Sequence, residues 1–401
     1  MSSVFTPIDS NLEGNFKFWM PYNQPDTEEI LTETLYEVTK KQIFKENSYT
    51  LTTSVLIKNS EHKKVSPIEW KFVQPFTEEN DKNIRYGFTL GLDEHSQDFY
   101  VSCKEKLDKW LDCLSSTCIM SGIENDFSIV KRIGKGKSAE VYLAISNENS
   151  QKYAIKAIEK ATLNAQSMSN LIEEIKIMRS LNHPNILKLH RVYESDSHIY
   201  LVLDYFEEGD LYSRIIKKKN FTEAAVAKFS QKLFEVLEYL DSKNIVHRDI
   251  KLENILMVSN ENDYDFKLAD FGLASKLGEG LTQICGSPGY IAPEILNRFS
   301  YGTKADVFSA GAVIYILLSG SMPFYGREVK QIIISNREAK INFHQKVWET
   351  ISSGAVNFLQ NIMDPRPSFR VSASEALKHP WFKTQNFEKF YVEAKVNSKL
   401  F

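Results

Sequence analysis

The stretch VHRDIKLENIL, at Val246–Leu256, organises the rest of the sequence, and LADFG follows it at Leu268–Gly272. Acidic, basic and amide side chains are crowded into these two segments, although apolar runs flank them. Polar groups are costly in such surroundings unless they have partners or a chemical task. Phosphoryl transfer uses this set, because one acid accepts a hydroxyl proton while an amide and a second acid hold magnesium against phosphate. The two segments therefore predict a phosphoryl-transfer site.

The bulk composition limits the classes of protein that need to be considered. The chain has 401 residues, enough for two or three domains with separate cores. Its 42% hydrophobic and 25% charged residues are typical of a globular protein, and its net charge of -3 predicts no nucleic-acid partner. Four cysteines without metal-binding spacing favour reduced thiols and a cytoplasmic location. The N-terminus does not resemble a signal peptide, and the longest apolar run, Ala310–Leu318, predicts a buried helix because it is too short to span a membrane.

The first part of the chain, residues 1–123, contains short aromatic-rich segments separated by polar turns. This pattern predicts a small antiparallel sheet or barrel. The predicted strands are NFKFWM at 15–20, ETLYEVTKKQIF at 33–44, SYTLTTSVLI at 48–57, IEWKFV at 68–73, IRYGFTL at 84–90 and DFYVSC at 98–103. After them, Leu107, Trp110, Leu111 and Leu114 recur at helical spacing and predict one closing amphipathic helix.

This sheet with its closing helix, ending in FYVSCKEKLDKWLDCL, resembles a pleckstrin homology (PH) domain, whose last helix commonly carries a tryptophan where Trp110 stands. The resemblance implies a PH-like β-barrel with a C-terminal capping helix. Membrane-binding members of that family place several basic residues around the first hairpin. Here Lys17 precedes an acidic stretch, and residues 1–123 contain 13 basic and 19 acidic side chains. Because this charge disfavours anionic lipid, we expect a protein-contact or autoregulatory module, with phosphoinositide binding and transient membrane association as the less favoured alternative.

A short linker, MSGIEND at 120–126, follows the first module. A linker of this length with one glycine predicts that the two modules sit against each other and do not swing freely.

A glycine-rich turn then joins two predicted strands in FSIVKRIGKGKSAEVYLAIS, where Gly134 and Gly136 fall in the turn. Glycine also serves ordinary hairpins, so this pattern alone has little specificity. The next strand, YAIK, ends in Lys156, which is an unusual residue in an apolar strand unless it has a function. We therefore expect the amides of the turn to cover phosphates whose oxygens Lys156 contacts.

A helix is predicted over 163–181, with Leu171, Ile175 and Met178 on one face and Glu174 beside it. Counting back from HPN at 183–185 selects Glu174, and not Glu173, as the partner of Lys156. The next run, HIYLVLDYFEEGDLYSRI, predicts a strand at 199–203 and a helix that begins near Asp210. Asp210 has two interpretations, a helix N-cap and a ribose contact, and they are compatible.

The motifs HRDIKLEN, DFG at Asp270–Gly272 and APE at Ala292–Glu294, in this order, resemble the eukaryotic protein kinase domain over about Asp126–Lys383. The resemblance implies an α+β chain in which the PH-like domain, 1–123, precedes a bilobal kinase fold, 126–383. The β-rich small lobe of this kinase fold would span 126–203 and its α-helical large lobe would span 207–383. A C-terminal tail, 384–401, would follow.

The same resemblance implies a role for each matching residue. Asp249 matches the base that orients and deprotonates the substrate hydroxyl, and Lys251 the residue that neutralises the moving phosphate. Lys156 and Glu174 match the ion pair that holds the ATP phosphates. Asn254 and Asp270 match the Mg2+ ligands. The implied nucleotide contacts are Ile133, Gly134, Gly136, Val141, Ala154, Lys156, Leu203, Asp204, Phe206, Asp210 and Leu256, and the implied structural ion pair is Glu294 with Arg370.

Lys251, two places after the base, is similar to the serine/threonine class, and CGSPGYIAPE, ILLSGSMPF and HPWF are most similar to the calcium/calmodulin-dependent kinase (CAMK) group. In that group, acidic residues at the positions of Asp210 and Glu253 often recognise an arginine three residues before the acceptor, so basic protein substrates are expected. The sequence has no DxDxDG calcium loop, and its short tail of mixed charge does not predict a calmodulin-binding helix. We expect a monomer.

The activation segment, LASKLGEGLTQICGSPGY, departs from the family pattern. Relatives that are activated by phosphorylation carry a threonine two places before the cysteine, where this chain has Gln283. Arg248 would normally pair with that phosphate. Thr282 is the expected substitute site, the alternative being a segment that orders without phosphate, and Ser287 is expected to be a structural residue that faces the substrate.

Two functions from different classes follow from these observations. One is an active kinase, and the other is a pseudokinase scaffold that binds partners through both domains. Because Lys156, Asp249, Asn254 and Asp270 are all present, the sequence favours the active enzyme.

Overall fold

The computed structural model describes residues 18–21, 28–38, 44–80, 83–92, 96–136, 139–218, 221–278 and 280–383. The chain divides into two compact units, one made of residues 1–172 and 189–205 and the other of residues 173–188 and 206–401. Lys17, part of the glycine-rich turn at 137–138 and the tail at 384–401 lie outside the described residues. Among the helices that are described, none is long and apolar enough to cross a membrane.

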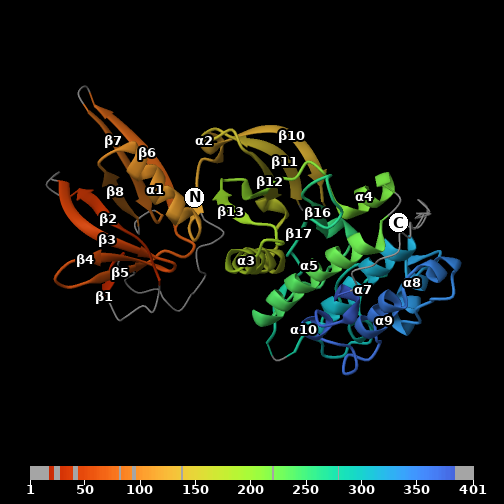
Figure 1. Cartoon of the computed structure of the whole chain (residues 1–401). Helices are drawn as coiled ribbons and strands as arrows, with labels where there is room; N and C mark the ends of the chain where they lie inside the picture. The colour runs from red at the N-terminus through yellow and green to blue at the C-terminus, as the bar shows by residue number, and fades with distance from the viewer. Residues whose placement is uncertain are drawn as a thin grey trace. The chain divides into compact units, whose positions relative to one another are not determined.

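The N-terminal module contains two antiparallel meanders and a helix (Figure 1). The first meander pairs β2 with β3, β3 with β4 and β4 with β5, while β1 adds to β5. The second pairs β6 with β7 and β7 with β8, and β2 meets β8 at the single pair Tyr36 and Tyr100. The bounds are β1 Met20–Pro21, β2 Glu29–Val38, β3 Phe44–Thr52, β4 Val55–Asn59, β5 Lys64–Pro67, β6 Phe72–Asn80, β7 Asn83–Leu90, β8 Gln97–Val101 and α1 Lys104–Ser115. Because β5 and β6 do not pair within the described residues, a closed barrel is not shown.

Three predicted strands of this module are interrupted. The stretch 33–44 belongs to two antiparallel strands, because β2 ends at Val38 and β3 begins at Phe44. The stretch 48–57 belongs to two strands, because β3 ends at Thr52 and β4 begins at Val55. The stretch 68–73 includes Trp70, whose φ of 66° is incompatible with a strand, so β6 begins only at Phe72. The turn between β3 and β4 lies at Thr53 and Ser54, where the Thr52 hydroxyl accepts from the amides of Ser54 and Val55. The alternating polarity of the sequence does not show this turn or the one at Trp70.

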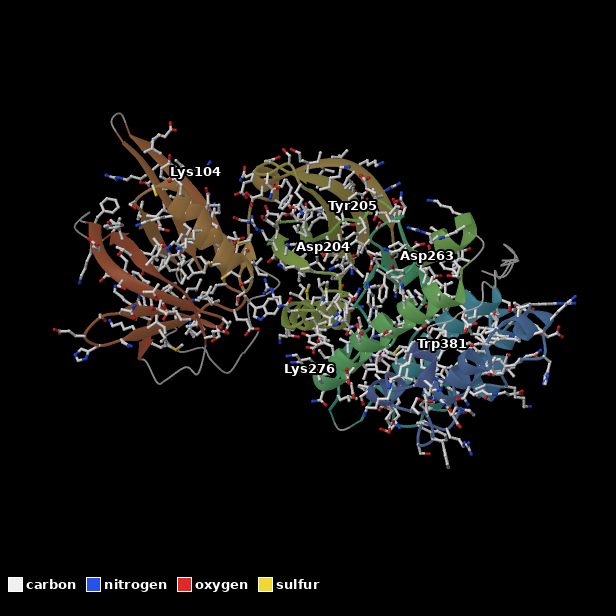
Figure 2. All side chains as sticks on the ribbon, viewed as in Figure 1. Lys104, Asp204, Tyr205, Asp263, Lys276 and Trp381 are labelled. Carbon is white, nitrogen blue, oxygen red and sulfur yellow. The ribbon has the colours of Figure 1, made fainter. Side chains whose placement is uncertain are left out.

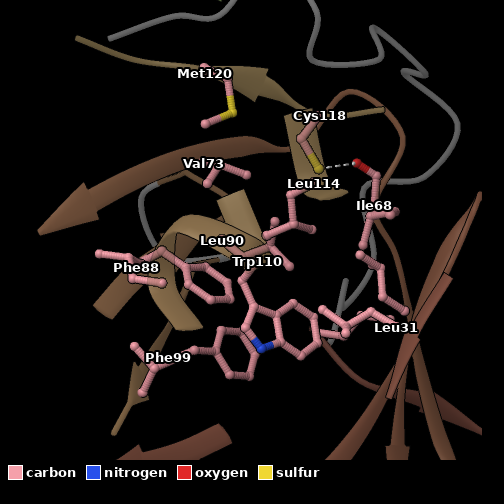
Figure 3. Close-up of a cluster of buried hydrophobic side chains, with 14 of the residues drawn as sticks. Leu31, Ile68, Val73, Phe88, Leu90, Phe99, Trp110, Leu114, Cys118 and Met120 are labelled. Atoms are coloured by element: carbon pink, nitrogen blue, oxygen red, sulfur yellow. Dashed lines mark hydrogen bonds between the residues drawn. The ribbon is translucent and has the colours of Figure 1, made fainter. Parts of the chain in front are cut away.

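The core of the module is a cluster of buried hydrophobic side chains that includes Trp110 and Leu114 of α1 (Figure 3). Leu107, Trp110 and Leu114 are buried on one face of this helix, as their spacing predicts. The Trp110 ring lies 6.0 Å from the ring of Phe88, which stacks in turn on Phe99 at 5.4 Å. These aromatic contacts bury a large apolar area and attach the helix to the second meander.

The rest of the first unit is a five-stranded antiparallel arrangement in the order β13-β14-β12-β11-β10 (Figure 1). Between β12 and β13 the chain forms α3, whose buried residues include Leu171, Ile175 and Met178. Helix α3 lies within the range that the sequence predicts for it. The bounds are α2 Ile123–Asp126, β10 Phe127–Lys135, β11 Ala139–Ser146, β12 Lys152–Glu159, η2 Lys160–Thr162, α3 Ala165–Ser180, β13 Leu189–Glu194 and β14 His198–Asp204.

A two-residue strand, β9 (Ile119–Met120), joins the module to these strands. It pairs in parallel with β6 on one side and with β13 on the other, so one sheet of 14 strands runs through both parts. The hydrophobic core is shared as well, because the cluster around Trp110 also includes Phe127, Tyr193 and Val202. The predicted linker is therefore structured, and it begins with part of a strand and ends with the helix α2.

The second unit is mostly helical (Figure 1). Its central helix is α7, in which fifteen residues from Ala305 to Ser319 are buried, as the apolar run predicts. Gly320 ends α7 with a φ of 69°, a left-handed conformation that suits glycine. The bounds are α4 Leu211–Lys218, α5 Glu223–Ser242, β15 Ile245–Val246, η3 Leu252–Asn254, β16 Ile255–Met257, β17 Phe266–Leu268, β18 Ser275–Lys276, α6 Pro293–Leu296, α7 Lys304–Ser319, α8 Val329–Glu338, η4 Lys346–Thr350, α9 Ser353–Ile362, α10 Ala373–Ala376 and η5 Pro380–Lys383.

Glu223, at the start of α5, holds two distant segments of this unit. Its carboxylate accepts hydrogen bonds from the hydroxyl and backbone amide of Ser352, which caps α9. It also accepts one from Trp381 Nε1 at 2.8 Å (Trp381 is labelled in Figure 2). Because all three donors meet one buried carboxylate, the charge is compensated and the last described turn is fixed to the helical core.

Candidate active site

The loop after β15 is held by a carboxylate from α7. Asp306 Oδ2 accepts a hydrogen bond from the amide of His247 at 2.6 Å, and Oδ1 accepts one from the amide of Arg248 at 2.9 Å. Burial raises the pKa of Asp306, and the two amides partly oppose that rise by stabilising the charged form. Arg248 has a φ of 69°, which is strained for a non-glycine residue. Asp306 therefore fixes a backbone conformation that the loop would not favour by itself.

Asp249 lies at the centre of a polar cluster. Its Oδ2 accepts from Lys251 Nζ at 2.7 Å and from Asn254 Nδ2 at 3.1 Å, while its Oδ1 accepts from Ser287 Oγ at 2.7 Å. Lys251 Nζ also donates to Ser287 Oγ at 2.9 Å. Asp249 is 8% exposed. A buried carboxylate with a cation and two neutral donors is held in one orientation, as a base that must align a hydroxyl group requires.

Asn254 and Asp270 are brought together by a short hairpin. Strands β16 and β17 pair Ile255 with Leu268, and the amide of Ala269 donates to the carbonyl of Asn254 at 2.8 Å. Asp270 follows directly, exposed and with a φ of 62°. Because Asn254 Nδ2 donates to both the carbonyl and the carboxylate of Asp249, its Oδ1 is the atom suited to a cation. An amide oxygen and a carboxylate are the ligand types that Mg2+ prefers.

Glu174, on α3, lies beside the same segment. A Cβ built on Gly272 would be 3.5 Å from Glu174 Oε2 and 3.2 Å from Asp270 Oδ1, so both carboxylates approach Gly272 closely. Glu174 is 7% exposed. The ring of Phe271 packs 4.8 Å from the ring of His247, which connects this segment to the catalytic loop.

In the first unit, the residues expected to contact phosphate are aligned across three strands. Gly134 is paired with Val141, and Val141 with Lys156. On the other side of β12, Ala154 is paired with Leu203 of β14. Gly136 donates its amide to the carbonyl of Ala139 at 2.8 Å, and Ile133 is 40% exposed at the end of β10. The β register therefore places Gly134, Val141 and Lys156 in one row.

The remaining predicted nucleotide contacts lie at the end of β14 and after it. Asp204 ends β14, where its Oδ1 is hydrogen-bonded to His190 Nε2 at 2.7 Å (Asp204 is labelled in Figure 2). Phe206 begins the part that belongs to the second unit. Asp210 forms a bridge with Leu256, and its Oδ1 accepts from the amide of Ser213 at 2.7 Å. The expectation that Asp210 caps a helix is therefore confirmed.

Comparisons with known proteins agree with this arrangement. A family model described as the protein kinase domain matches residues 127–382. The chain is 37% identical over 269 residues to myosin light chain kinase A of Dictyostelium discoideum, a match that covers 67% of this chain and 91% of that protein. It is 32% identical over 283 residues to calcium/calmodulin-dependent protein kinase type 1 of Macrobrachium nipponense (70% and 82% covered). It is also 38% identical over 269 residues to serine/threonine-protein kinase DCLK3 of Mus musculus, of which the chain covers only 34%.

The chain belongs to the protein kinase family. Because these relatives are serine/threonine kinases, it is a protein serine/threonine kinase, and it is similar to the CAMK group. The bilobal fold implied by the sequence motifs is consistent with a strand-rich part and a helical part of this kinase.

The sequence motifs also identify a structural ion pair in this kinase. Arg370 Nη1 and Nη2 donate to the two oxygens of Glu294 at 2.6 and 2.9 Å. Arg370 is fully buried, and its Nη1 also donates to the carbonyl of Lys304 at 2.8 Å. A bidentate pair of this kind compensates both charges, whereas removing one partner would leave a buried charge.

The sequence did not predict two features of the kinase site. Ser287 was expected to be a structural residue that faces the substrate, and its contacts with Asp249 and Lys251 were not predicted. Asp306 was not singled out, although an acidic residue at the beginning of an otherwise apolar helix is a signal that could have identified it. Its role depends on a contact with residues 58 and 59 positions away, which no local pattern shows.

Proposed function

We propose that this kinase transfers the γ-phosphate of ATP to serine and threonine hydroxyls of proteins, with a preference for arginine three residues before the acceptor. The geometry of Asp249 supports the reaction most directly, because its carboxylate is oriented by Lys251, Asn254 and Ser287. In this proposal Asp249 accepts the proton of the substrate hydroxyl, and Lys251 neutralises charge on the phosphate in transit.

Asn254 and Asp270 are proposed to hold Mg2+ through their side-chain oxygens. The donor set fits the ion, since both ligands are hard oxygen atoms and Asn254 already uses its amide nitrogen on Asp249. When bound, Mg2+ would compensate the negative charge of the ATP phosphates.

The first unit is proposed to bind ATP. The row of Gly134, Val141 and Lys156 supports this role, because backbone amides and a lysine at the end of a strand suit phosphate oxygens. Leu203, Asp204 and Phe206 are proposed to meet the adenine ring, and Asp210 the ribose.

The substrate preference is proposed from two acidic residues of the second unit. Glu253 lies in η3, within the catalytic loop, and Asp210 forms its bridge with Leu256 just after that loop. Two carboxylates on adjacent segments favour a cationic side chain by Coulombic attraction. Basic protein substrates are therefore the proposed partners of a cytoplasmic, monomeric kinase.

The N-terminal module is proposed to be a PH-like autoregulatory element that supports the small lobe through direct contact. Its four-stranded and three-stranded meanders and its closing helix support the PH-like topology. The shared core and the strand β9 support regulation by contact, since a change in the module would be transmitted to packed residues of the lobe. Phosphoinositide binding is the less favoured alternative.

The direct test is phosphate transfer from Mg-ATP to a basic peptide by the full-length kinase. The variant Asp249→Asn should reduce kcat about a thousandfold, because general-base catalysis contributes on this scale. It should leave the Kd for ATP unchanged, since Asp249 is not among the proposed ATP contacts. Asp265→Asn, which changes a carboxylate outside this cluster, is the matched control and should leave kcat unchanged. Equal rates for Asp249→Asn and wild type would contradict the assignment of Asp249, and complete inactivity of the wild type would favour the scaffold.

The same assay tests the finer parts of the proposal. A peptide without the arginine three residues before the acceptor should have a higher KM. Calcium-loaded calmodulin should not change the rate, because no calmodulin-binding helix is predicted from the sequence. A calmodulin-dependent increase in rate would show that the proposal is wrong on this point.

A further inference from the structure

The side chain of Arg248 is occupied by neutral acceptors of the kinase itself. Its Nε donates to the carbonyl of Leu273 at 2.5 Å, just after the DFG motif. Its Nη1 donates to the hydroxyl of Tyr301 at 3.4 Å. The guanidinium of Arg248, which relatives would use to bind a phosphothreonine, therefore connects Leu273 at the beginning of the activation segment to Tyr301.

Tyr301 in turn holds the middle of the activation segment. Its hydroxyl donates to the carbonyl of Gln283 at 2.8 Å, and its backbone amide donates to the carbonyl of Leu281 at 2.9 Å. Cys285 Sγ lies 3.7 Å from the same hydroxyl. Tyr301 is 5% exposed, and burial raises its pKa to about 12, so the hydroxyl remains protonated and can donate throughout the neutral range.

The end of the segment is fixed against the same loop. A Cβ on Gly286, whose φ is 102°, would lie 2.7 Å from the carbonyl oxygen of Arg248, so only glycine fits there. The next residue, Ser287, donates to Asp249. The positions that could carry a phosphate in relatives, Thr282 and Gln283, are both exposed.

We propose that Tyr301 is a positioning residue that orders the activation segment of this kinase without a phosphate group. Its hydroxyl accepts from the Arg248 guanidinium and donates to the main chain of Gln283, and it thereby connects Leu273, the catalytic loop and the segment before Ser287. Thr282 then needs no phosphate for the site to be complete. The inference rests on the kinase activity, but it also has a readout that does not require activity.

The first experiment compares full-length kinases after treatment with a Ser/Thr phosphatase. Mass spectrometry first verifies that residues 273–294 carry no phosphate. The wild type and Thr282→Ala should keep their rate of transfer to a basic peptide. Tyr301→Phe should raise the KM for the peptide about tenfold, because it removes a hydrogen bond to a charged group, and should leave the KM for ATP unchanged. Tyr325→Phe, at an exposed tyrosine, is the control and should match the wild type.

Two further variants separate positioning from loss of stability. If Arg248 and Tyr301 act through one link, the Arg248→Gln/Tyr301→Phe double variant should lose no more than the worse single variant. Gln283→Glu places a carboxylate where relatives carry the phosphate, and its activity should stay within about twofold of wild type if Arg248 is already satisfied. Additive losses, a gain with Gln283→Glu, or a tenfold loss on dephosphorylation of the wild type would each overturn the proposal.

The second readout is alkylation of Cys285 by iodoacetamide, quantified by mass spectrometry with Cys103 as the internal reference. Release of the segment should make Cys285 react several-fold faster in Tyr301→Phe than in the wild type, while the thermal midpoint shows whether each variant is folded. An unchanged rate in the folded variant would overturn the role of Tyr301, whatever the transfer activity is.

Discussion

The catalytic loop and the N-terminal module are held in place by opposite means. The loop depends on polar contacts, in which Asp306 fixes the backbone and Asp249 collects three donors. The module depends on apolar packing around Trp110, which continues into the strands of the small lobe. Polar contacts are directional, so they specify residues one at a time, whereas apolar packing tolerates exchange when volume is conserved. A motif of specific residues can therefore identify the loop, whereas the module is identified only by the spacing of its apolar residues.

The largest effect is expected for the packing of the module. Trp110→Ala should lower the free energy of unfolding by about 3–5 kcal/mol, because it removes a fully buried ring and leaves a cavity. Since the core is shared, the small lobe should lose stability together with the module. Near-ultraviolet circular dichroism and ATP binding, followed during heating, should report the same lowered midpoint.

The matched control for Trp110→Ala is Asp108→Ala, an exposed position on the same helix, which should change the stability by less than about 0.5 kcal/mol. If Trp110→Ala left the midpoint measured by ATP binding unchanged, the module and the lobe would have separate cores. The comparison would then be between two independent domains.

A smaller effect is expected where Asp126, the last residue of the linker, contacts β13 of the lobe. The Tyr193 hydroxyl donates to Asp126, and Arg191 lies 3.5 Å from both Asp126 and Asp112 of α1. Burial and the Asp126 carboxylate raise the pKa of Tyr193, so the hydroxyl stays protonated. Tyr193→Phe should cost about 1.5 kcal/mol, as for other hydrogen bonds to charged groups. If the module supports the lobe, kcat should also fall.

Tyr200→Phe is the control for this contact, because Tyr200 is paired with Tyr193 on the adjacent strand but does not take part in the Asp126 contact. The measurements are thermal unfolding and peptide phosphorylation by the full-length kinase. A higher kcat in Tyr193→Phe would show that the module restrains the kinase, and an unchanged kcat would favour a targeting role.

The contrast also explains how far the sequence could be interpreted. The roles of Asp249, Asn254 and Asp270 could be proposed from the sequence, because the motifs HRDIKLEN and DFG resemble those of protein kinases. The contacts of Asp306 and Tyr301 could not be predicted, since they join the catalytic loop and the activation segment to residues far along the chain. In the module, the helix was predictable from its apolar spacing, but the turns at Thr53 and Trp70 and the short strand β9 were not. Pairing of a two-residue strand depends on neighbours that periodicity does not reveal.

The smallest effect, no binding at all, is expected when phosphoinositide vesicles are offered to the module. Two of its lysines already have carboxylate partners, since Lys58 pairs with Glu37 and Lys109 with Glu33 at 2.5 Å. With 13 basic and 19 acidic residues in 1–123, the surroundings repel anionic lipid as well. The full-length kinase should therefore stay in the supernatant when the vesicles are sedimented at physiological salt.

A charge-based explanation makes this negative result testable. The Glu33→Gln/Glu37→Gln variant would release both lysines and remove two negative charges, so its sedimentation with the vesicles should increase, and salt should reverse the increase by screening. Asp98→Asn/Asp108→Asn removes the same number of charges without releasing Lys58 or Lys109, and it should bind less than the first variant. Lipid-specific sedimentation of the wild type would instead mean that the module recognises a headgroup through residues other than these lysines, and targeting would replace autoregulation as its proposed role.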